Sequence, residues 1–339
     1  MNSPIEVLIT LPFTEELVSQ LQAVSPRLRL TLQKASKPED IPAEIWQRTE
    51  ILYTDRVLPK PDQAPALGWI QFHWAGLERA IDEPILRKPE LVATSLSGAA
   101  ATQVAEHVVL MCLALGHRLP DLVDHQKRAE WPRERFKRFL PLELRDSTVG
   151  IVGFGSIGRE VARLLHAFGA TILASKRDAM HPDDSGYLPE GLGDPRGDLL
   201  HRLYPPQALR SMLKECDFVV VAVPLTPKTR DLIGAEQLAV MKPTAFLVDV
   251  SRGGIVNHPA LLLALRERKI AGAALDVFPE EPLPADSPLW KFPNVLLTPH
   301  ISGNSPFYDQ RAIVLFADNL ARYLAGAPLL NTVDPLRGY

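Results

Sequence analysis

The 339-residue chain has only two cysteines, Cys112 and Cys216, and no excess of charge of either sign. Both cysteines lie inside apolar runs, which favours buried thiols over a disulfide, a metal site or a nucleophile. With 37 basic and 40 acidic side chains, the net charge of −3 gives no electrostatic reason to expect nucleic acid or an anionic membrane as a partner. We therefore expect neither a disulfide framework nor a metal centre.

Long apolar stretches are also missing. The opening residues 1–6 lack the basic segment and apolar run of a signal peptide, and no apolar stretch approaches the ~18 residues of a membrane span. These two absences predict a cytoplasmic protein. The composition, 46% hydrophobic and 23% charged, is that of an ordinary globular protein, and the length corresponds to about two domains.

Short apolar runs alternate with helix-like stretches through the first hundred residues. Strands and helices that alternate in this way need crossover helices and parallel pairing, so this part of the chain is predicted to be a small α/β domain. The expected strands are 5–10, 28–32, 51–54, 69–73 and 91–94, with helices near 15–24 and 41–49.

A second α/β unit follows. An apolar helix is expected from Thr102 to His117, and then a polar segment, 118–146, that fits a solvated or subunit-contact arm better than a nucleic-acid patch. The segment 178–206 is rich in Pro, Gly and Asp and is predicted to be a long surface loop. Strands are expected at 148–152, 171–174, 218–223, 245–248, 271–275 and 295–298.

A glycine-rich motif directly follows the strand 148–152. Its sequence is Gly153-Phe154-Gly155-Ser156-Ile157-Gly158, it opens a predicted helix, and the next strand ends about twenty residues later, as in dinucleotide-binding βαβ units. Gly153 would allow the tight turn, Gly155 would let backbone N–H groups approach a pyrophosphate, and Gly158 would let helix and strand pack closely. The helix N-terminus adds a positive dipole end. We therefore expect a nicotinamide dinucleotide.

The end of the next strand bears on which dinucleotide is bound. An NAD enzyme usually places Asp or Glu there, whereas this chain has Ser175, Lys176 and Arg177. The two cations can pair with a 2′-phosphate and Ser175 can donate a hydrogen bond to it, which favours NADP. The alternative is NAD, with Asp178 binding the ribose and the cations solvated.

Three polar residues lie just beyond other strand ends: Arg252, Glu281 and His300. The carboxyl ends of parallel strands meet at one edge of a sheet, so these residues can converge beside the nucleotide. A histidine with a carboxylate partner can give or take a proton near neutral pH, and a fixed arginine can bind a carboxylate and polarise the neighbouring carbonyl. This set suits hydride transfer to a 2-oxo acid.

Four blocks of the chain resemble the D-isomer-specific 2-hydroxyacid dehydrogenases: 149–158, 248–256, 274–282 and 293–303. The resemblance implies two α/β domains, with a Rossmann-type doubly wound parallel sheet inserted into a smaller flavodoxin-like substrate domain. It places the dinucleotide-binding domain at 102–301 and the substrate domain at 1–101 plus 302–339. A homodimer through the segment 102–139 is also implied.

The resemblance further implies roles for individual residues. His300 matches the acid/base, Glu281 rather than Glu280 its partner, and Arg252 the substrate-orienting arginine, while His107 is expected to pack rather than react. Substrate-binding residues would be Ala75, Gly76, Leu77, Ser97, Gly98 and Arg252. Cofactor-binding residues would be Gly153, Gly155, Ser156, Ile157, Gly158, Ser175, Lys176, Arg177, Val223, Pro224, Thr229, Val250, Asp276, His300 and Gly303.

Some positions depart from the family pattern. Ser95 stands where many members have Asn, and His73 and Trp74 are bulky, so the pocket size cannot be transferred from any one member. A nucleotide-sensing corepressor of the same fold is the alternative function, although the chain lacks appended interaction tails. Phosphite or formate oxidation is disfavoured because Ala75 replaces a lysine of the first type and Glu281 a glutamine of the second.

Overall fold

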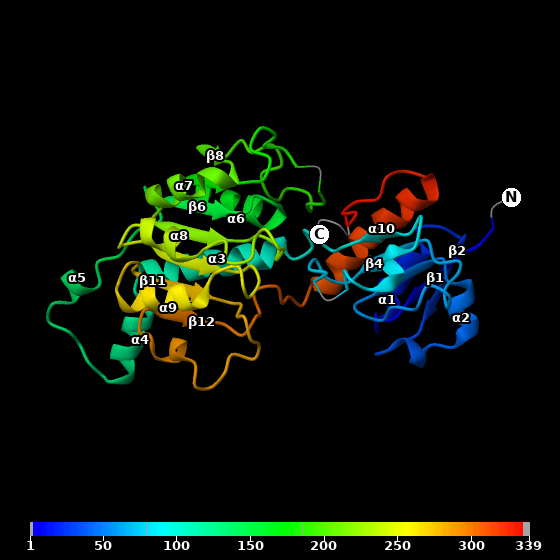
Figure 1. Ribbon diagram of the computed structural model, residues 1–339, viewed down its shortest axis with the longest axis horizontal. Helices are drawn as coiled ribbons and strands as arrows, with labels where there is room; N and C mark the ends of the chain where they lie inside the picture. Colours follow the sequence, from blue (N-terminus) through cyan, green and yellow to red (C-terminus); the bar gives the residue numbers. More distant parts are fainter. Residues whose placement is uncertain (1–2, 79, 185, 335–339) are drawn as a thin grey trace. The chain divides into compact units, whose positions relative to one another are not determined.

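The computed structural model describes residues 3–78, 80–184 and 186–334. The chain divides into two compact units. One contains the described residues up to Ala100 and from Ser305 onward, and the other is Ala101–Asn304. Each unit is described by itself (Figure 1).

The first unit is a five-stranded, fully parallel sheet in the order β2-β1-β3-β4-β5. This is the strand order of flavodoxin-like folds. Helices α1 (Glu15–Gln22) and α10 (Tyr308–Ala325) pack on one face, and α2 (Ala43–Arg48) contributes Trp46 to the core on the other. The strands are β1 (Ile5–Ile9), β2 (Leu28–Leu32), β3 (Ile51–Thr54), β4 (Trp69–Phe72) and β5 (Val92–Thr94).

The second unit is a seven-stranded parallel sheet in the order β12-β11-β10-β9-β6-β7-β8. Chain order runs outward in both directions from β6, so the β6/β9 boundary is the topological switch point of a doubly wound sheet. The strands are β6 (Thr148–Val152), β7 (Thr171–Ser175), β8 (Arg202–Tyr204), β9 (Phe218–Val221), β10 (Phe246–Asp249), β11 (Gly272–Leu275) and β12 (Val295–Leu297).

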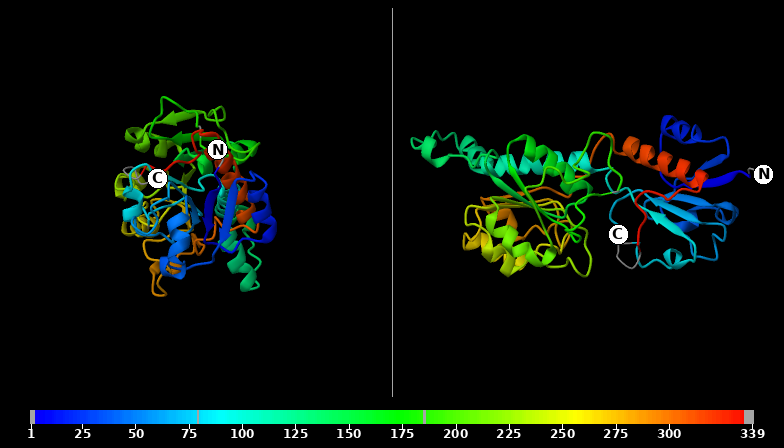
Figure 2. Two further views of the ribbon diagram at one scale, coloured as in Figure 1. Left: turned by 90° about the vertical axis from the view of Figure 1, so that its right-hand side faces the viewer. Right: turned by 90° about the horizontal axis from the view of Figure 1, so that it is seen from above.

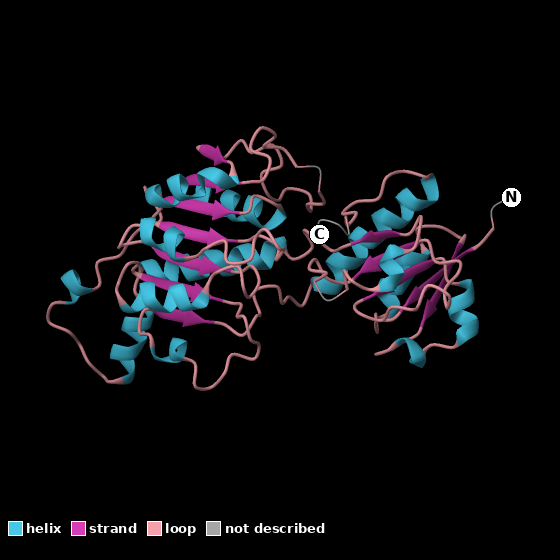
Figure 3. Ribbon diagram, viewed as in Figure 1, coloured by secondary structure: helices cyan, strands magenta, loops and turns pink. Residues whose placement is uncertain are grey.

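Helices cover both faces of this sheet, as Figure 3 shows. Helices α3 (Ala101–Gly116) and α6 (Ser156–Ala167) pack together on one face, and α7 (Leu209–Glu215), α8 (Ala235–Val240) and α9 (His258–Arg266) form a row on the other. Helices α4 (Leu119–Lys127) and α5 (Arg135–Arg138) extend away from the rest of their unit (Figure 2). Within the described residues, no helix combines the length and apolar character needed to cross a membrane.

The observed architecture confirms the predicted fold class of two parallel α/β units. One expectation is wrong: the segment 178–206 is not loop throughout, because Arg202–Tyr204 forms the edge strand β8 beside β7. Three residues are too few to show an apolar alternation, and Pro205 directly follows the strand. Its pairing with β7 is a long-range property that local sequence does not display.

Candidate active site

The predicted residues of the second unit lie beyond the carboxyl ends of its strands. The glycine loop follows β6, Arg252 follows β10, Asp276 follows β11 and His300 follows β12. These four strands are parallel. Strands β10, β11 and β12 are neighbours in the sheet, and β9 lies between β10 and β6. All four features therefore lie along the carboxyl edge of one sheet.

The three motif glycines have different surroundings. Gly153 has φ +104°, and a Cβ there would lie 2.6 Å from the carbonyl oxygen of Ala222; a Cβ at Gly158 would lie 2.1 Å from the carbonyl oxygen of Gly153. A Cβ at Gly155 would meet no atom within 4 Å. The first and third glycines thus permit close packing, while the second leaves open space at the N-terminus of α6, as bound phosphates require.

The carboxyl end of β7 carries the residues that were predicted to select the cofactor. Ser175 is buried as the last residue of the strand, and the Lys176 ammonium donates to the carbonyl oxygens of His181 (2.8 Å) and Asp183 (2.6 Å). The Asp178 carboxylate accepts from His181 Nδ1 at 2.8 Å, and this hydrogen bond lowers the pKa of Asp178. Arg177 is exposed.

His300 and Glu281 form a hydrogen-bonded pair. His300 Nδ1 lies 2.8 Å from Glu281 Oε2, and Glu281 Oε1 accepts the backbone N–H of Phe278 at 3.0 Å. His300 has φ +53°, a left-handed conformation that is uncommon for a residue with a Cβ and concentrates at functional positions. The two side chains are 42% and 35% exposed, so the pair is reachable from solvent.

Asp276 holds the turn that carries His300. Its buried carboxylate accepts the hydroxyl of Thr298 at 2.6 Å and the backbone N–H groups of Ile301 and Ser302 at 2.9 Å each. These bonds flank His300 on both sides. The turn is therefore anchored to the end of β11 at three points.

Thr298 is a site residue that the sequence reasoning missed. Its hydroxyl lies 3.3 Å from Nε2 of His107, and burial lowers the pKa of His107. His107 thus contacts a residue that helps to hold the turn of His300. The sequence signal for Thr298 is its position as the last residue of the predicted strand 295–298, which the structure ends at Leu297.

Arg252 is brought beside the Glu281 segment by close backbone packing. Its Nη1 donates to the carbonyl oxygen of Ser251 at 2.8 Å. A Cβ on the next residue, Gly253, would lie 1.9 Å from the carbonyl oxygen of Phe278, the residue whose N–H binds Glu281. The loop that carries Arg252 and the loop that carries Glu281 are therefore in contact.

A buried carboxylate underlies the arginine loop. Asp249 accepts both the N–H and the hydroxyl of Ser251 and is fully enclosed. Burial raises its pKa to about 7, and the charge of Asp276 also raises it, while the hydrogen bonds from Ser251 lower it. With this pKa, the carboxyl group beneath the loop that carries Arg252 titrates near neutral pH.

The remaining predicted cofactor residues also lie in the second unit. Val250 is buried after β10, and the carbonyl oxygen of Gly303 accepts the side-chain amide of Gln103 at 2.8 Å. The hydroxyl of Thr229 donates to the carbonyl oxygen of Pro224 at 2.6 Å, which orders the loop that begins at Val223.

Apart from Arg252, the predicted substrate residues lie in the first unit, on the loops that follow β4 and β5. The backbone N–H of Leu96 donates to the carbonyl oxygen of Trp74 at 3.1 Å, which links these loops. The side-chain amide of Asn331 donates to the carbonyl oxygen of Ser97 at 2.7 Å. Ala75, Gly76, Leu77, Ser97 and Gly98 are thus neighbours within their own unit.

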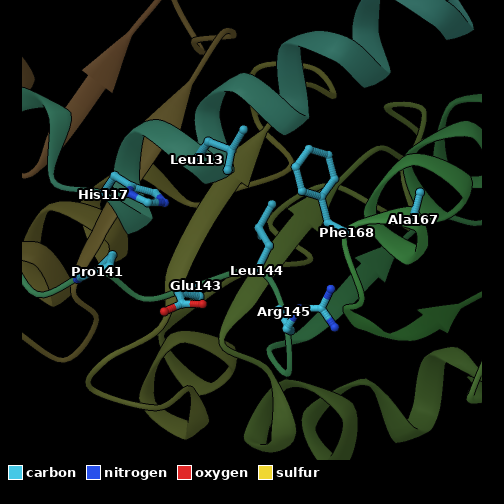
Figure 4. A pocket seen from close by; sticks show the side chains of 8 residues that line it. All are labelled: Leu113, His117, Pro141, Glu143, Leu144, Arg145, Ala167 and Phe168. Atoms are coloured by element: carbon cyan, nitrogen blue, oxygen red, sulfur yellow. The ribbon is translucent and has the colours of Figure 1, made fainter.

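A hollow in the second unit contains none of the predicted site residues (Figure 4). It is lined from the end of α3, from the segment just before β6 and from the end of α6. Strand β6 begins at Thr148, so this hollow lies at the amino edge of the sheet, opposite the glycine loop. Its lining residues are Leu113, His117, Pro141, Glu143, Leu144, Arg145, Ala167 and Phe168.

A doubly wound sheet with a glycine loop at its switch point is typical of dinucleotide-binding α/β proteins, and here a histidine–carboxylate pair lies on the same carboxyl edge. Residues 109–302 match the family model described as D-isomer specific 2-hydroxyacid dehydrogenase, NAD binding domain. The chain belongs to the D-isomer specific 2-hydroxyacid dehydrogenase family, which confirms the resemblance seen in the sequence.

Known relatives resemble the chain along most of its length. It is 36% identical to a glyoxylate reductase of Thermofilum pendens over 81% of this chain and 77% of the relative. It is 32% identical to a D-3-phosphoglycerate dehydrogenase of Methanocaldococcus jannaschii over 97% of this chain, but spans only 59% of that relative, and 48% of a second one from Synechocystis. A solved family member from Xanthobacter autotrophicus, in complex with NADPH and MES, superimposes with a TM-score of 0.79 at 28% identity, covering 99% and 100% of the two chains.

Proposed function

We propose that the protein is an NAD(P)-dependent oxidoreductase that interconverts a 2-oxo acid and a D-2-hydroxy acid. The observation that carries this proposal is the 2.8 Å pair of His300 and Glu281 on the same sheet edge as the glycine loop. Family membership and the name of the glyoxylate reductase from Thermofilum pendens support it.

The residues of the second unit account for the steps of such a reaction. The bound nicotinamide would supply the hydride. His300 donates a proton to the oxygen of the oxo group, and Glu281 orients the imidazole and stabilises its charged form. Arg252 binds the substrate carboxylate and polarises the adjacent carbonyl. Substrate contacts from Ala75, Gly76, Leu77, Ser97 and Gly98 stay a prediction.

The first experiment follows the oxidation of NADPH and NADH by absorbance with glyoxylate, hydroxypyruvate, pyruvate, 2-oxobutyrate and phenylpyruvate at equal concentration. Turnover with any of them supports the reductase. Binding of the cofactor without turnover on the whole panel would favour the nucleotide-sensing alternative.

NADP is the cofactor we favour. The Lys176 ammonium uses two of its three donors on loop carbonyls, which leaves one for a 2′-phosphate in a fixed position. The competing residue, Asp178, is engaged by His181 and by the backbone N–H of Met180. The Xanthobacter structure holds NADPH. A lower KM for NADPH than for NADH would support this choice, and the reverse order would contradict it.

We also propose a homodimer formed through the segment 102–139. Exposed large apolar side chains are frequent in and next to this segment, and such a patch is typical of a protein–protein interface. They are Leu110, Leu119, Leu122, Val123, Trp131, Phe136 and Leu140, with Trp131 and Phe136 about four-fifths exposed.

Sedimentation velocity tests this interface. Replacing both Trp131 and Phe136 by Glu should convert a dimer to a monomer, whereas Phe307→Glu, which alters an exposed aromatic in the other unit, should leave it intact. A monomeric wild-type protein would contradict the dimer.

A further inference from the structure

Two buried charges of opposite sign stand side by side directly after the glycine loop. The side chains of Arg159 and Glu160, in the first turns of α6, are 0% and 1% exposed. A buried charge is costly unless it is paired and hydrogen-bonded, so both residues require partners. Arg159 finds its partners in the segment between β7 and β8, the green loop beside α6 in Figure 1, and Glu160 binds both this segment and Arg163 of α6.

Arg159 binds this segment through its whole guanidinium. Its Nε lies 3.3 Å from Oδ2 of Asp184, and its two terminal nitrogens donate to the carbonyl oxygens of Asp194 and Pro182. The guanidinium also lies over the ring of Phe154, 4.3 Å from its centroid. Phe154 is the residue between the first two motif glycines, so one side chain joins the glycine loop to the segment 182–194.

Glu160 provides a second attachment. Its carboxylate accepts the backbone N–H of Gly193 at 2.6 Å and also forms two hydrogen bonds with Arg163. Gly193 has φ +71°, and a Cβ there would lie 2.9 Å from Cδ1 of Leu188. The attachment therefore depends on glycine at this position.

The segment is also ordered internally. The buried carboxylate of Asp194 accepts the backbone N–H groups of Asp198 and Leu199, and the N–H of Asp184 donates to the carbonyl oxygen of Pro195 at 3.0 Å. The described residues of this loop, which leave out residue 185, are therefore bonded to one another as well as to α6.

Lys176 binds the start of the same loop. It donates to the carbonyl oxygens of His181 and Asp183, the residues that flank Pro182, and the carbonyl oxygen of Pro182 binds Arg159. The position of the Lys176 ammonium thus depends on a loop that Arg159 holds.

We propose that Arg159 is a positioning residue for cofactor selection: it holds the 182–194 segment on α6, and this segment fixes Lys176 where it selects the 2′-phosphate of NADP. The inference rests on the proposed function, because it assumes that the site binds a nicotinamide dinucleotide. Arg159 acts through Lys176 and through the loop, without touching the phosphate itself.

The test compares NADPH with NADH in Arg159→Met. The ratio of kcat/KM for NADPH to kcat/KM for NADH should fall about tenfold or more, mainly through the KM for NADPH, while kcat at saturating cofactor changes less than about threefold. In the double variant with Lys176→Met, the losses should be far from additive, because both substitutions remove the same interaction. Arg210→Met, which alters an exposed ion pair on α7, is the matched control.

Hydrogen exchange reports the loop directly. Faster exchange is expected in Arg159→Met at the N–H groups of Asp184, Gly193, Asp198 and Leu199, with unchanged protection in β6 and β9. If Arg159→Met does not fold, Gly193→Ala loosens the same segment without exposing a buried charge, and it should lower the cofactor ratio in the same direction.

The outcomes separate the two proposals. An unchanged NADPH-to-NADH ratio in the folded variant would overturn the role of Arg159, as would a wild-type protein that uses both cofactors equally well; in either case the dinucleotide-binding function stands. A wild-type protein that binds neither NADPH nor NADH in a calorimetric titration would overturn both.

Discussion

His300 Nδ1 and Glu281 Oε2 meet at 2.8 Å although 19 positions separate the two residues along the chain. The pair forms because Asp276 fixes the turn around His300 while the N–H of Phe278 fixes the second oxygen of Glu281. Hydrogen bonds between carboxylates and backbone N–H groups thus fix both partners beyond the ends of the neighbouring strands β11 and β12. Proton transfer needs this kind of preorganisation.

Removing the acid/base pair should abolish turnover but not cofactor binding. We expect His300→Ala to lower kcat by about 10²–10⁴-fold, the usual contribution of a positioned acid or base, and Glu281→Gln to lower it at least about tenfold. Glu280→Gln, one position earlier, is the control and should change kcat by less than about twofold. Fluorescence titration with NADPH checks that binding persists. Retained activity in His300→Ala would rule out its assignment.

Arg252→Lys should raise the KM for the oxo acid by about tenfold or more. Lysine keeps the charge, but its single ammonium cannot bind a carboxylate with two parallel hydrogen bonds. Steady-state kinetics with varied oxo acid measures the change, and the Kd for NADPH should stay the same. Arg266→Lys, at the exposed end of α9, is the matched control. Equal KM values in the two variants would contradict the role of Arg252.

Asp276→Ala should lower both the stability of the protein and its kcat. The substitution leaves the N–H groups of Ile301 and Ser302 without their acceptor, and the unpaired N–H of the buried Ser302 should cost about 1–3 kcal/mol. Urea unfolding should show the loss, and kcat should fall because the turn of His300 is released. Asp276→Asn keeps one acceptor oxygen, so its stability and its kcat should lie between those of Asp276→Ala and the wild type. A variant as stable as the wild type would show that these bonds do not hold the turn.

Asp249 should make the stability of the protein depend on pH. Burial raises its pKa from 3.8 to about 7, so the folded state binds the proton more tightly than the unfolded state does. The stabilising contribution is full below about pH 4 and is lost as the pH rises through about 7. Asp249→Asn lacks this titration, and its gain in unfolding free energy over the wild type should therefore grow from pH 5 to pH 8, by on the order of 1–4 kcal/mol.

Urea unfolding of both proteins at pH 5, 6, 7 and 8 measures this difference. A second variant, Asp178→Asn, alters an exposed carboxylate and should follow the wild-type profile in this range far more closely. A constant difference between Asp249→Asn and the wild type across the four pH values would show that Asp249 does not titrate there.

Local pattern was sufficient for much of the architecture. The strands 28–32, 51–54 and 148–152 have the bounds that the sequence predicts, because short segments rich in apolar and β-branched residues are characteristic of strands. The glycine motif also has its predicted place between a strand and a helix. Strand β8 could not be predicted, since three residues at a sheet edge show no period.

The sequence by itself determined the order of most strands and helices, the glycine loop and the candidates Arg252, Glu281 and His300, because periodicity and motif spacing are properties of neighbouring residues. Only the tertiary structure decided that Thr298 and Asp276 support His300, that Asp249 is enclosed, and that Arg159 binds the segment beside Lys176. These relationships depend on which distant residues share a buried space. Burial and hydrogen-bond partners across 20 or more positions arise from the packing of the sheet edge, and no local pattern records them.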